Sequence, residues 1–346
     1  MISKLLSIIV PTYNMEHYLK QCLSSLVCDK DCLDKMEILV INDGSTDTSS
    51  EIAHQYESSY PETFKVIDKK NGNYGSCINV GLSITTGKYV KILDADDYFV
   101  TEKIESFISF LNTNNCDLII SDYQTVKEDG VVVDNYTYNH TFNTLTDFFV
   151  PGIPYLQMHA ITYRTDLLKS INYSQSEGLS YTDQEWAFSP MSAVNTIGYF
   201  NDVIYQYRIG RADQTMDPVK YKNNFWQDIR VVENMILYYK QIKKESLNKP
   251  QSFYLRRRLV ERIYNIYYNF FKVFRLNYSN EELIAFDIFI KEHVPELYDE
   301  FNKYTLNEGR LLHDYHYIKE WRRNKCRPTI IMRFSNIYSS FRKKFQ

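Results

Sequence analysis

Three aspartates in the stretch Asp94-Ala95-Asp96-Asp97 have the residue type and the spacing of a cation site. Asp94 and Asp96 are two positions apart, so both side chains point to one face if the chain is extended there. Carboxylates that converge at the end of a strand suit a hard cation such as Mg²⁺ or Mn²⁺, whose other ligands are phosphate oxygens and water. The alternative is that Asp97 caps a helix starting near Thr101 while the other two are solvated. We expect a cation site and leave the role of Asp97 open.

Two further polar clusters follow apolar runs, at residues 11–14 (Pro-Thr-Tyr-Asn) and 42–45 (Asn-Asp-Gly-Ser). In an open parallel sheet, ligands bind beyond the carboxyl ends of the strands. The carboxylate of Asp43 can accept a hydrogen bond from the N–H of a nucleobase there, although the same pattern also fits a plain capped turn. A Gly- and Asn-rich turn at residues 71–76 opens a predicted helix, where backbone amides favour an anion. Together these clusters predict a nucleotide site.

The elements that position these clusters are apolar runs of strand length that alternate with helical patterns. The predicted strands are Leu5–Val10, Met36–Ile41, Phe64–Ile67, Lys88–Leu93, Asp117–Ser121, His159–Tyr163 and Val203–Tyr207. Predicted helices include Glu16–Leu26 and Ser49–Tyr56. This alternation predicts an α/β fold with a doubly wound, mostly parallel sheet flanked by helices.

Beyond Asp217 the sequence changes to long helical patterns, at Phe225–Ile242 and Gln251–Phe274. We therefore predict a sheet domain at residues 1–217 and an α-helical C-terminal region at residues 218–346. After Pro328, apolar and aromatic residues recur on one face of a predicted helix, and Arg and Lys cover the rest. This basic amphipathic tail fits an anionic membrane surface, and it fits equally well against the rest of the protein or a second subunit.

The composition excludes several classes of protein. A net charge of −3 offers no basic surface for nucleic acid. The six cysteines show no Cys-x-x-Cys spacing, which argues against a zinc site and fits reduced thiols in a cytoplasm. No stretch reaches the ~18 apolar residues of a membrane-spanning helix. We predict a cytoplasmic protein that is soluble or peripheral at the inner face of the membrane, and the oligomeric state stays open.

Three segments resemble glycosyltransferase family 2 in order and spacing: residues 7–14 (SIIVPTYN), 40–47 (VINDGSTD) and 87–97 (GKYVKILDADD). The resemblance implies a GT-A fold, which is Rossmann-like, and an inverting mechanism. It also implies a nucleotide diphosphate donor, usually a UDP-sugar, together with Mn²⁺ or Mg²⁺. The turn at residues 71–76 resembles a subgroup from bacterial surface-polysaccharide synthesis, which implies a glycan or lipid-linked acceptor. The sheet domain would then have a nucleotide-sugar half at about residues 1–100 and an acceptor half at about residues 101–217.

The resemblance also implies roles for the residues that match its motifs. Contacts to the nucleoside and donor sugar would come from Pro11, Thr12, Tyr13, Asp43, Asn71, Gly72, Asp94 and Ala95. Asp96 would bind the metal that bridges the diphosphate. One departure is Ile78, which stands where many members of the family have an arginine. The donor contact of that arginine must be absent here or come from elsewhere.

An inverting transfer needs a base that takes the proton of the acceptor hydroxyl. The family places this base in an acidic pair that opens a helix, and the matching stretch is residues 181–186, Tyr-Thr-Asp-Gln-Glu-Trp. Thr182 and Glu185 have the spacing of a capping box, which would give Glu185 a structural role. Asp183 would then face the cleft, and we predict that it is the base in preference to Glu185.

Two more predicted contacts lie outside these motifs. The stretch at residues 207–215 combines cations with a glycine, so a loop carrying Arg211 and Gln214 would fold over the diphosphate; the alternative is a solvated surface. His159 stands at the start of a predicted strand on the acceptor side. Its role is open between a structural residue and a metal or acceptor contact.

These observations favour an inverting glycosyltransferase over two alternatives. A sugar nucleotidyltransferase would have a Gly-rich loop with Arg or Lys directly after the first strand, and residues 11–14 do not form one. A protein that only binds a nucleotide-sugar would need no base, and Asp183 and the aspartate cluster argue against it.

Overall fold

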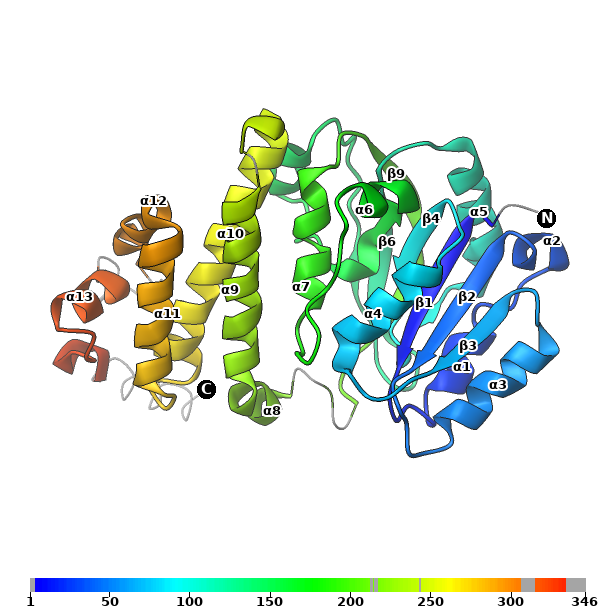
Figure 1. Ribbon diagram of the computed structural model, residues 1–346, viewed down its shortest axis with the longest axis horizontal. Helices are drawn as coiled ribbons and strands as arrows, with labels where there is room; N and C mark the ends of the chain where they lie inside the picture. The colour runs from blue at the N-terminus through cyan, green and yellow to red at the C-terminus, as the bar shows by residue number, and fades with distance from the viewer. Residues whose placement is uncertain (1–3, 212–213, 215–216, 243, 306–314, 334–346) are drawn as a thin grey trace. The chain divides into compact units, whose positions relative to one another are not determined.

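The computed structural model describes residues 4–211, 214, 217–242, 244–305 and 315–333. By its internal contacts the chain divides into two compact units, Met1–Thr215 with Leu247–Tyr254, and Met216–Ser246 with Leu255–Gln346. The first unit holds the sheet and the second is helical (Figure 1). The assignment of a donor half and an acceptor half within the first unit stays a prediction.

The sheet of the first unit has the strand order β3-β2-β1-β4-β8-β6-β9-β5, with β7 paired to β6. The strands are β1 Leu6–Thr12, β2 Met36–Asn42, β3 Phe64–Asp68, β4 Tyr89–Ile92, β5 Tyr98–Phe99, β6 Leu118–Val126, β7 Val132–Tyr136, β8 Ile161–Arg164 and β9 Ile197–Arg208. The β3-β2-β1-β4 part and the β6–β9 pair are parallel, whereas β8 runs antiparallel to both of its neighbours. The predicted α/β fold with a largely parallel sheet is confirmed.

The first four strands begin and end close to their predicted positions, and three of them, β1, β2 and β4, are buried along almost their whole length. Every residue of β1 is buried, and so is every residue of β4. A strand that is covered on both faces reads as a continuous apolar run, which makes it easy to recognise in a sequence. The carboxyl ends of β1, β2 and β4 lie side by side in the sheet, so the three polar clusters that follow them meet at one edge.

Helices and short turns connect these strands (Figure 1). The helices are α1 Leu19–Ser24, α2 Lys30–Leu33, α3 Ser49–Ser59, α4 Asn73–Ile84, α5 Ile104–Thr113, α6 Thr165–Ser170 and α7 Asp183–Trp186. Turns of 3₁₀ helix are η1 Thr101–Lys103, η2 Leu145–Phe149, η3 Met158–Ala160 and η4 Ser189–Ser192. His159 therefore lies in η3, directly before β8, and not in the strand that was predicted to begin there.

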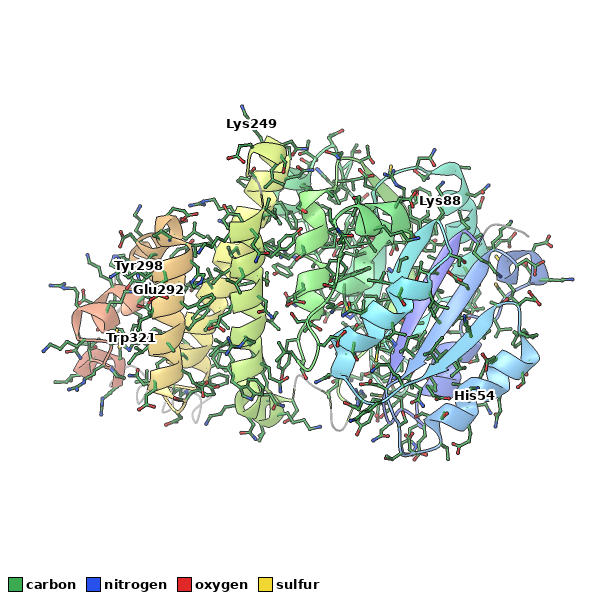
Figure 2. The ribbon with its side chains drawn as sticks, in the orientation of Figure 1. His54, Lys88, Lys249, Glu292, Tyr298 and Trp321 are labelled. Atoms are coloured by element: carbon green, nitrogen blue, oxygen red, sulfur yellow. The ribbon has the colours of Figure 1, made fainter. Side chains whose placement is uncertain are left out.

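The second unit consists of helices whose core contains charged and aromatic side chains. The helices are α8 Pro218–Asn223, α9 Phe225–Gln241, α10 Lys249–Tyr268 (of which the second unit holds the part from Leu255 on), α11 Asn280–His293, α12 Pro295–Tyr298 and α13 Tyr317–Arg323, with 3₁₀ turns η5 Lys244–Ser246 and η7 Glu300–Lys303 and a π-helical turn η6 Asn269–Val273. Arg322 Nη2 donates to Asp287 Oδ1 at 2.7 Å, and its guanidinium lies 3.6 Å from the ring centre of Tyr298. Tyr298 and Trp321 are labelled in Figure 2. These contacts tie α11, α12 and α13 together.

The predicted basic tail lies mostly outside the described residues, which end at residue 333. Ile330 and Ile331, at its start, are 72% and 46% exposed. Its proposed membrane or protein contact therefore stays a prediction. Within the described ranges, no helix is long and apolar enough to cross a bilayer.

Candidate active site

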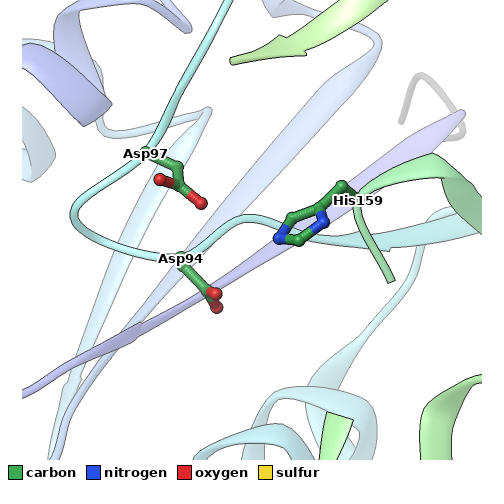
Figure 3. A group of neighbouring side chains, drawn as sticks. All are labelled: Asp94, Asp97 and His159. Carbon is green, nitrogen blue, oxygen red and sulfur yellow. The ribbon is translucent and has the colours of Figure 1, made fainter. Parts of the chain in front are cut away.

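The acidic stretch after β4 forms a tight turn, not an extended segment. The backbone N–H of Asp97 donates to the carbonyl of Asp94 at 2.9 Å. The expectation that Asp94 and Asp96 share one face because the chain is extended is therefore wrong. The turn instead places Asp97 beside Asp94, and one potential ligand atom each from Asp94, Asp97 and His159 lie within 4.8 Å of one another (Figure 3).

Asp97 is anchored to β9 and does not cap the helix that follows. Its carboxylate accepts a hydrogen bond from the hydroxyl of Tyr205 at 2.7 Å and one from the backbone N–H of Arg208 at 2.8 Å. The side chain is 1% exposed. The alternative of a helix cap at Asp97 is wrong, because η1 begins without any side-chain cap.

Asp96 points to a different partner from Asp94 and Asp97. Its Oδ2 accepts a hydrogen bond from Nε of Arg211 at 2.5 Å, and its backbone carbonyl accepts one from Nε of Arg208 at 2.8 Å. On the other side of Arg211, Gln214 Nε2 donates to the carbonyl of Arg208 at 2.7 Å. The roles of Asp96 as a metal ligand and of Arg211 and Gln214 as donor contacts stay predictions.

The acidic turn concentrates negative charge in a buried place. Burial, and then the charges of Asp96 and Asp94, raise the pKa of Asp97 well above its usual range. Burial, and then the charge of Asp96, raise the pKa of Asp94 to about 7, and the charge of Asp183 contributes to the same rise. Such a cluster favours any cation that can bind it.

The predicted donor contacts of the first two strand ends lie around a turn that Asp43 holds in place. Its carboxylate accepts hydrogen bonds from the backbone N–H groups of Gly72 and Asn73, both at 2.9 Å, and from Nζ of Lys69 at 2.5 Å. Asp43 is 3% exposed. Thr12 is equally buried, whereas Tyr13 is 47% exposed. In this structure Asp43 fixes the turn at residues 71–73, and its contact with a nucleobase stays a prediction.

The turn at residues 71–76 also packs closely against the segment that precedes α7. A Cβ atom on Gly75 would lie 1.9 Å from the backbone oxygen of Ser176, so only glycine fits at this position. Asn79 Nδ2 likewise donates to the carbonyl of Gln175 at 2.9 Å. These contacts connect the strand-end turn to the segment that carries the predicted base.

Glu185 makes structural contacts, but the predicted capping box is wrong, and the choice of Asp183 over Glu185 as the base stays a prediction. Its two carboxylate oxygens accept hydrogen bonds from the N–H and the hydroxyl of Ser176, at 2.7 and 2.6 Å. Thr182 makes no capping hydrogen bond with its side chain, and its hydroxyl instead accepts a hydrogen bond from Gln175 at 3.0 Å. Both carboxylate oxygens of Glu185 thus hold the segment before α7.

Asp183 is half-buried at the first position of α7. Its Oδ2 accepts a hydrogen bond from the side-chain amide of Gln184 at 2.8 Å. The charge of Asp183 is one of the causes that raise the pKa of Asp94. It also helps to raise the pKa of Tyr74, after the larger effects of burial and of Asp94. Asp183 therefore lies near enough to Asp94 and Tyr74 to interact with them electrostatically, and its proton-transfer role stays a prediction.

We expect Glu185→Gln to lower the free energy of unfolding by about 1–3 kcal/mol, because the new amide would place an NH₂ group against a donor of Ser176. Urea unfolding measures this effect, with Glu105→Gln on the exposed face of α5 as the matched control. Activity per folded molecule should stay within a few-fold of wild type. A stable Glu185→Gln protein that has lost transfer would make Glu185 the base instead.

Three side chains at this site were not predicted. Tyr74 donates a hydrogen bond to Asp94 at 2.8 Å, and Tyr205 donates to Asp97. Lys91 is fully buried within β4, and its Nζ donates to the carbonyls of His159 and Ile161 at 2.7 and 3.2 Å. The sequence did contain an indication for Lys91, because the charged group of a lysine within a buried strand needs a hydrogen-bonding partner.

Residues 7–171 match a family model described as glycosyl transferase family 2. Among curated proteins, the chain is 28% identical over 215 residues to the putative glycosyltransferase EpsH of Bacillus subtilis, covering 59% of this chain and 60% of EpsH. It is 27% identical over 256 residues to the poly(ribitol-phosphate) beta-N-acetylglucosaminyltransferase TarS of Staphylococcus aureus, covering 71% of this chain and 44% of TarS. The chain thus spans about half the length of these curated relatives. The family resemblance of the sequence is confirmed.

Solved structures agree with this fold over nearly the whole chain. A crystal structure of S. aureus TarS 1-349 in complex with UDP-GlcNAc superposes with a TM-score of 0.68 at 22% identity, covering 98% of this chain and 92% of that one. A mannosyltransferase of Pyrobaculum calidifontis in complex with GDP-Man and Mn²⁺ superposes with a TM-score of 0.50 at 15% identity, covering 86% and 82%. At these identities the likeness shows the fold alone, and it confirms the expected GT-A architecture.

Proposed function

Because residues 7–171 belong to glycosyl transferase family 2, we propose that this chain is an inverting glycosyltransferase. It would transfer a sugar from a nucleotide diphosphate donor to a hydroxyl group. The observation that supports this most directly is that Asp183 lies close enough to the acidic turn for its charge to contribute to the raised pKa of Asp94, behind burial and the charge of Asp96. A carboxylate base and carboxylates that suit a cation would thus act on the same substrates.

Asp183 would take the proton of the acceptor hydroxyl while the acceptor oxygen attacks the donor carbon. The bond from that carbon to the diphosphate oxygen breaks as the new glycosidic bond forms, so the configuration at the carbon inverts. By analogy with glycoside hydrolysis, positive charge develops on the sugar ring in the transition state. The contacts of Glu185 with Ser176 would hold α7, and therefore Asp183, in position.

A divalent cation, Mn²⁺ or Mg²⁺, would offset the negative charge that builds on the leaving diphosphate. The residues of the acidic turn fit such an ion, because their crowded and buried carboxylates favour a positive partner. We keep Asp96 as the proposed ligand that contacts the ion beside the diphosphate. Arg211, which pairs with Asp96 in this structure, would then turn towards the phosphates.

The donor and acceptor are proposed from the relatives. The names of TarS and of its UDP-GlcNAc complex support a UDP-sugar donor, and the poly(ribitol-phosphate) acceptor of TarS supports a cell-surface glycan or lipid-linked glycan as acceptor. Such an acceptor would be met in the cytoplasm, at the inner face of the membrane. Ile78 is fully buried, and Arg211 would supply the donor contact that an arginine at this position makes in many members of the family.

Binding of a panel of nucleotides and nucleotide-sugars, with and without Mn²⁺, tests this proposal. We expect UDP or one UDP-sugar to raise the melting temperature or to give a calorimetric signal that depends on the metal. The Asp96→Ala variant should lose this metal-dependent nucleotide binding. If no nucleotide binds under any metal condition, the proposed activity is wrong.

The alternative function is binding of a nucleotide-sugar without turnover. This alternative predicts the same nucleotide-binding results as the proposed enzyme. Only an assay of sugar transfer distinguishes the two. A sugar nucleotidyltransferase is less well supported, since the segment after β1 has no Gly-rich loop with Arg or Lys.

A further inference from the structure

We infer that one face of the β7-β6-β9 part of the sheet binds the acceptor as an uncharged saccharide, with Tyr136 and Tyr207 stacking on its pyranose rings. The use of this subsite in transfer rests on the proposed function, whereas the binding of a saccharide does not. The inference goes beyond the proposed function because it names the class of acceptor. It also differs from the poly(ribitol-phosphate) in the name of TarS, which is a charged polymer of open-chain units.

The register of the strands places four tyrosines on one face of the sheet. Tyr123 of β6 pairs with Tyr136 of β7 on one side and with Tyr205 of β9 on the other. Side chains of paired residues, and of residues two apart along a strand, point to the same face, so Tyr207 shares it. We call these four residues the tyrosine face. Neighbouring strands lie about 4.8 Å apart, so the tyrosine face extends roughly 10 Å across three strands, which suits an extended ligand.

The rings of the tyrosine face form a row that leads to the acidic turn. Tyr136 stacks on Tyr123 with ring centres 4.5 Å apart and an angle of 1° between the ring planes. At the other end of the row, Tyr207 stacks on the imidazole of His159 at 4.4 Å. That imidazole in turn has an atom within 4.8 Å of carboxylate oxygens of the acidic turn. A ligand that lies along the row therefore reaches the candidate active site at its Tyr207 end.

The electrostatic environment of Tyr207 agrees with this position. Burial, and then the charges of the three aspartates of the acidic turn, raise the pKa of the Tyr207 hydroxyl, and the charge of Asp183 adds to the rise. Tyr207 is thus near the proposed base as well as the acidic turn. A sugar ring that stacks on Tyr207 would hold one of its hydroxyl groups close to Asp183.

The two tyrosines at the ends of the row are accessible, whereas the two between them are buried. Tyr136 and Tyr207 are half-buried, and Tyr123 and Tyr205 are 3% and 0% exposed. Within the described part of the chain, the hydroxyl groups of Tyr136 and Tyr207 have no hydrogen-bond partner. A tyrosine offers an apolar ring and a polar hydroxyl, and a pyranose likewise has an apolar C–H face and a rim of hydroxyl groups. These two side chains therefore match a sugar ring in both respects.

The charge of the tyrosine face favours a neutral ligand over a polyanion. Thr125 and Asp134 form the next cross-strand pair on this face of β6 and β7 and add a hydroxyl group and a negative charge. None of the residues of β6, β7 and β9 that share the face is an arginine or a lysine. Phosphate groups are bound mainly by these two cations. A chain of ribitol phosphates would meet no positive partner here and would be repelled by Asp134.

Saturation-transfer NMR with cellobiose, lactose and N,N′-diacetylchitobiose tests the subsite, and a trimer of ribitol phosphate is the comparison ligand. We expect at least one disaccharide to receive magnetisation when the aromatic protons of the wild-type protein are irradiated. The ribitol phosphate trimer should receive none. In wild-type protein whose tyrosine rings are deuterated, the disaccharide signal should disappear. This comparison needs no substitution and does not depend on the folding of a variant.

The Tyr136→Ala variant gives a second measurement, on the edge strand β7. We expect it to weaken binding of the disaccharide about 10-fold, since a stacked aromatic ring is lost. The acceptor KM should rise by the same factor while kcat and donor affinity stay within a few-fold of wild type. Tyr136→Phe should retain most of the affinity because it keeps the ring. Tyr60→Ala is the matched control: Tyr60 is also half-buried and packs against Phe64 at 5.7 Å, but it lies at the amino end of β3, away from the strand ends that carry the site.

Three results would overturn the tyrosine face as a saccharide subsite. They are binding of none of the disaccharides, a disaccharide signal that survives deuteration of the tyrosine rings, and unchanged binding in Tyr136→Ala. If nucleotides still bind and sugar is transferred to the ribitol phosphate trimer, the proposed function stands and only this inference fails. Disaccharide binding at the tyrosines of a protein that binds no nucleotide would instead support the subsite and remove the proposed function.

Discussion

Asp183→Asn is expected to lower the rate of sugar transfer by about 10²- to 10⁴-fold, because an amide cannot accept the proton of the acceptor hydroxyl. The substitution keeps the size of the side chain, and Asn can still accept the hydrogen bond from Gln184. Donor binding should therefore stay within a few-fold of wild type. Single-turnover transfer from the UDP-sugar identified in the binding panel gives the rate, and calorimetry gives the affinity.

The control for this variant is Asp166→Asn, which removes an exposed carboxylate from the first turn of α6. It should leave both transfer and donor binding unchanged. If the Asp183→Asn variant transfers sugar at the wild-type rate, Asp183 has no part in the mechanism and the base is unidentified. If the wild-type protein binds a UDP-sugar tightly but transfers nothing to any glycan acceptor, the non-catalytic alternative is correct.

The core strands could be predicted because the sequence pattern that indicates them lies within each strand. β1 and β2 are apolar, β-branched runs that are buried along almost their whole length, and each follows or precedes a turn-forming segment. The order of β8 and β9 in the sheet could not be read in this way. β8 lies between β4 and β6, and its partners come from segments far away along the chain. Sheet order depends on such distant pairings, which local patterns do not encode.

The meeting of the polar clusters at one edge of the sheet could be predicted from the sequence, but the contacts within the candidate site could not. The argument that Asp94 and Asp96 share a face assumed an extended chain, and the turn from Asp97 to Asp94 reverses that geometry. The capping box at Thr182 failed for a different reason, because Ser176 supplies a better partner for Glu185 than the helix N-terminus does. A local backbone turn replaced the extended chain at Asp94, whereas a contact from outside the helix replaced the local cap at Glu185.

Arg211→Ala is expected to lower kcat/KM for transfer by about 10²- to 10³-fold, the usual cost of removing one group that stabilises developing charge. In this structure the guanidinium pairs with Asp96 at 2.5 Å and lies 5.6 Å from the ring centre of Tyr18. Its loop contains Gly210, whose φ of 82° lies in the region that favours glycine. We expect the arginine to move from Asp96 to the diphosphate when donor and metal enter.

Comparison of UDP with uridine separates this role from a purely structural one. If Arg211 contacts the phosphates, Arg211→Ala weakens UDP binding and leaves uridine binding unchanged, and Arg211→Lys recovers only part of the loss because a lysine lacks the planar fork. If Arg211 serves only to neutralise Asp96, the variant leaves that carboxylate unpaired, and Mn²⁺ binding should then become tighter with no selective loss for UDP. The second pattern would mean that the positive charge which the leaving diphosphate needs must come from the cation alone.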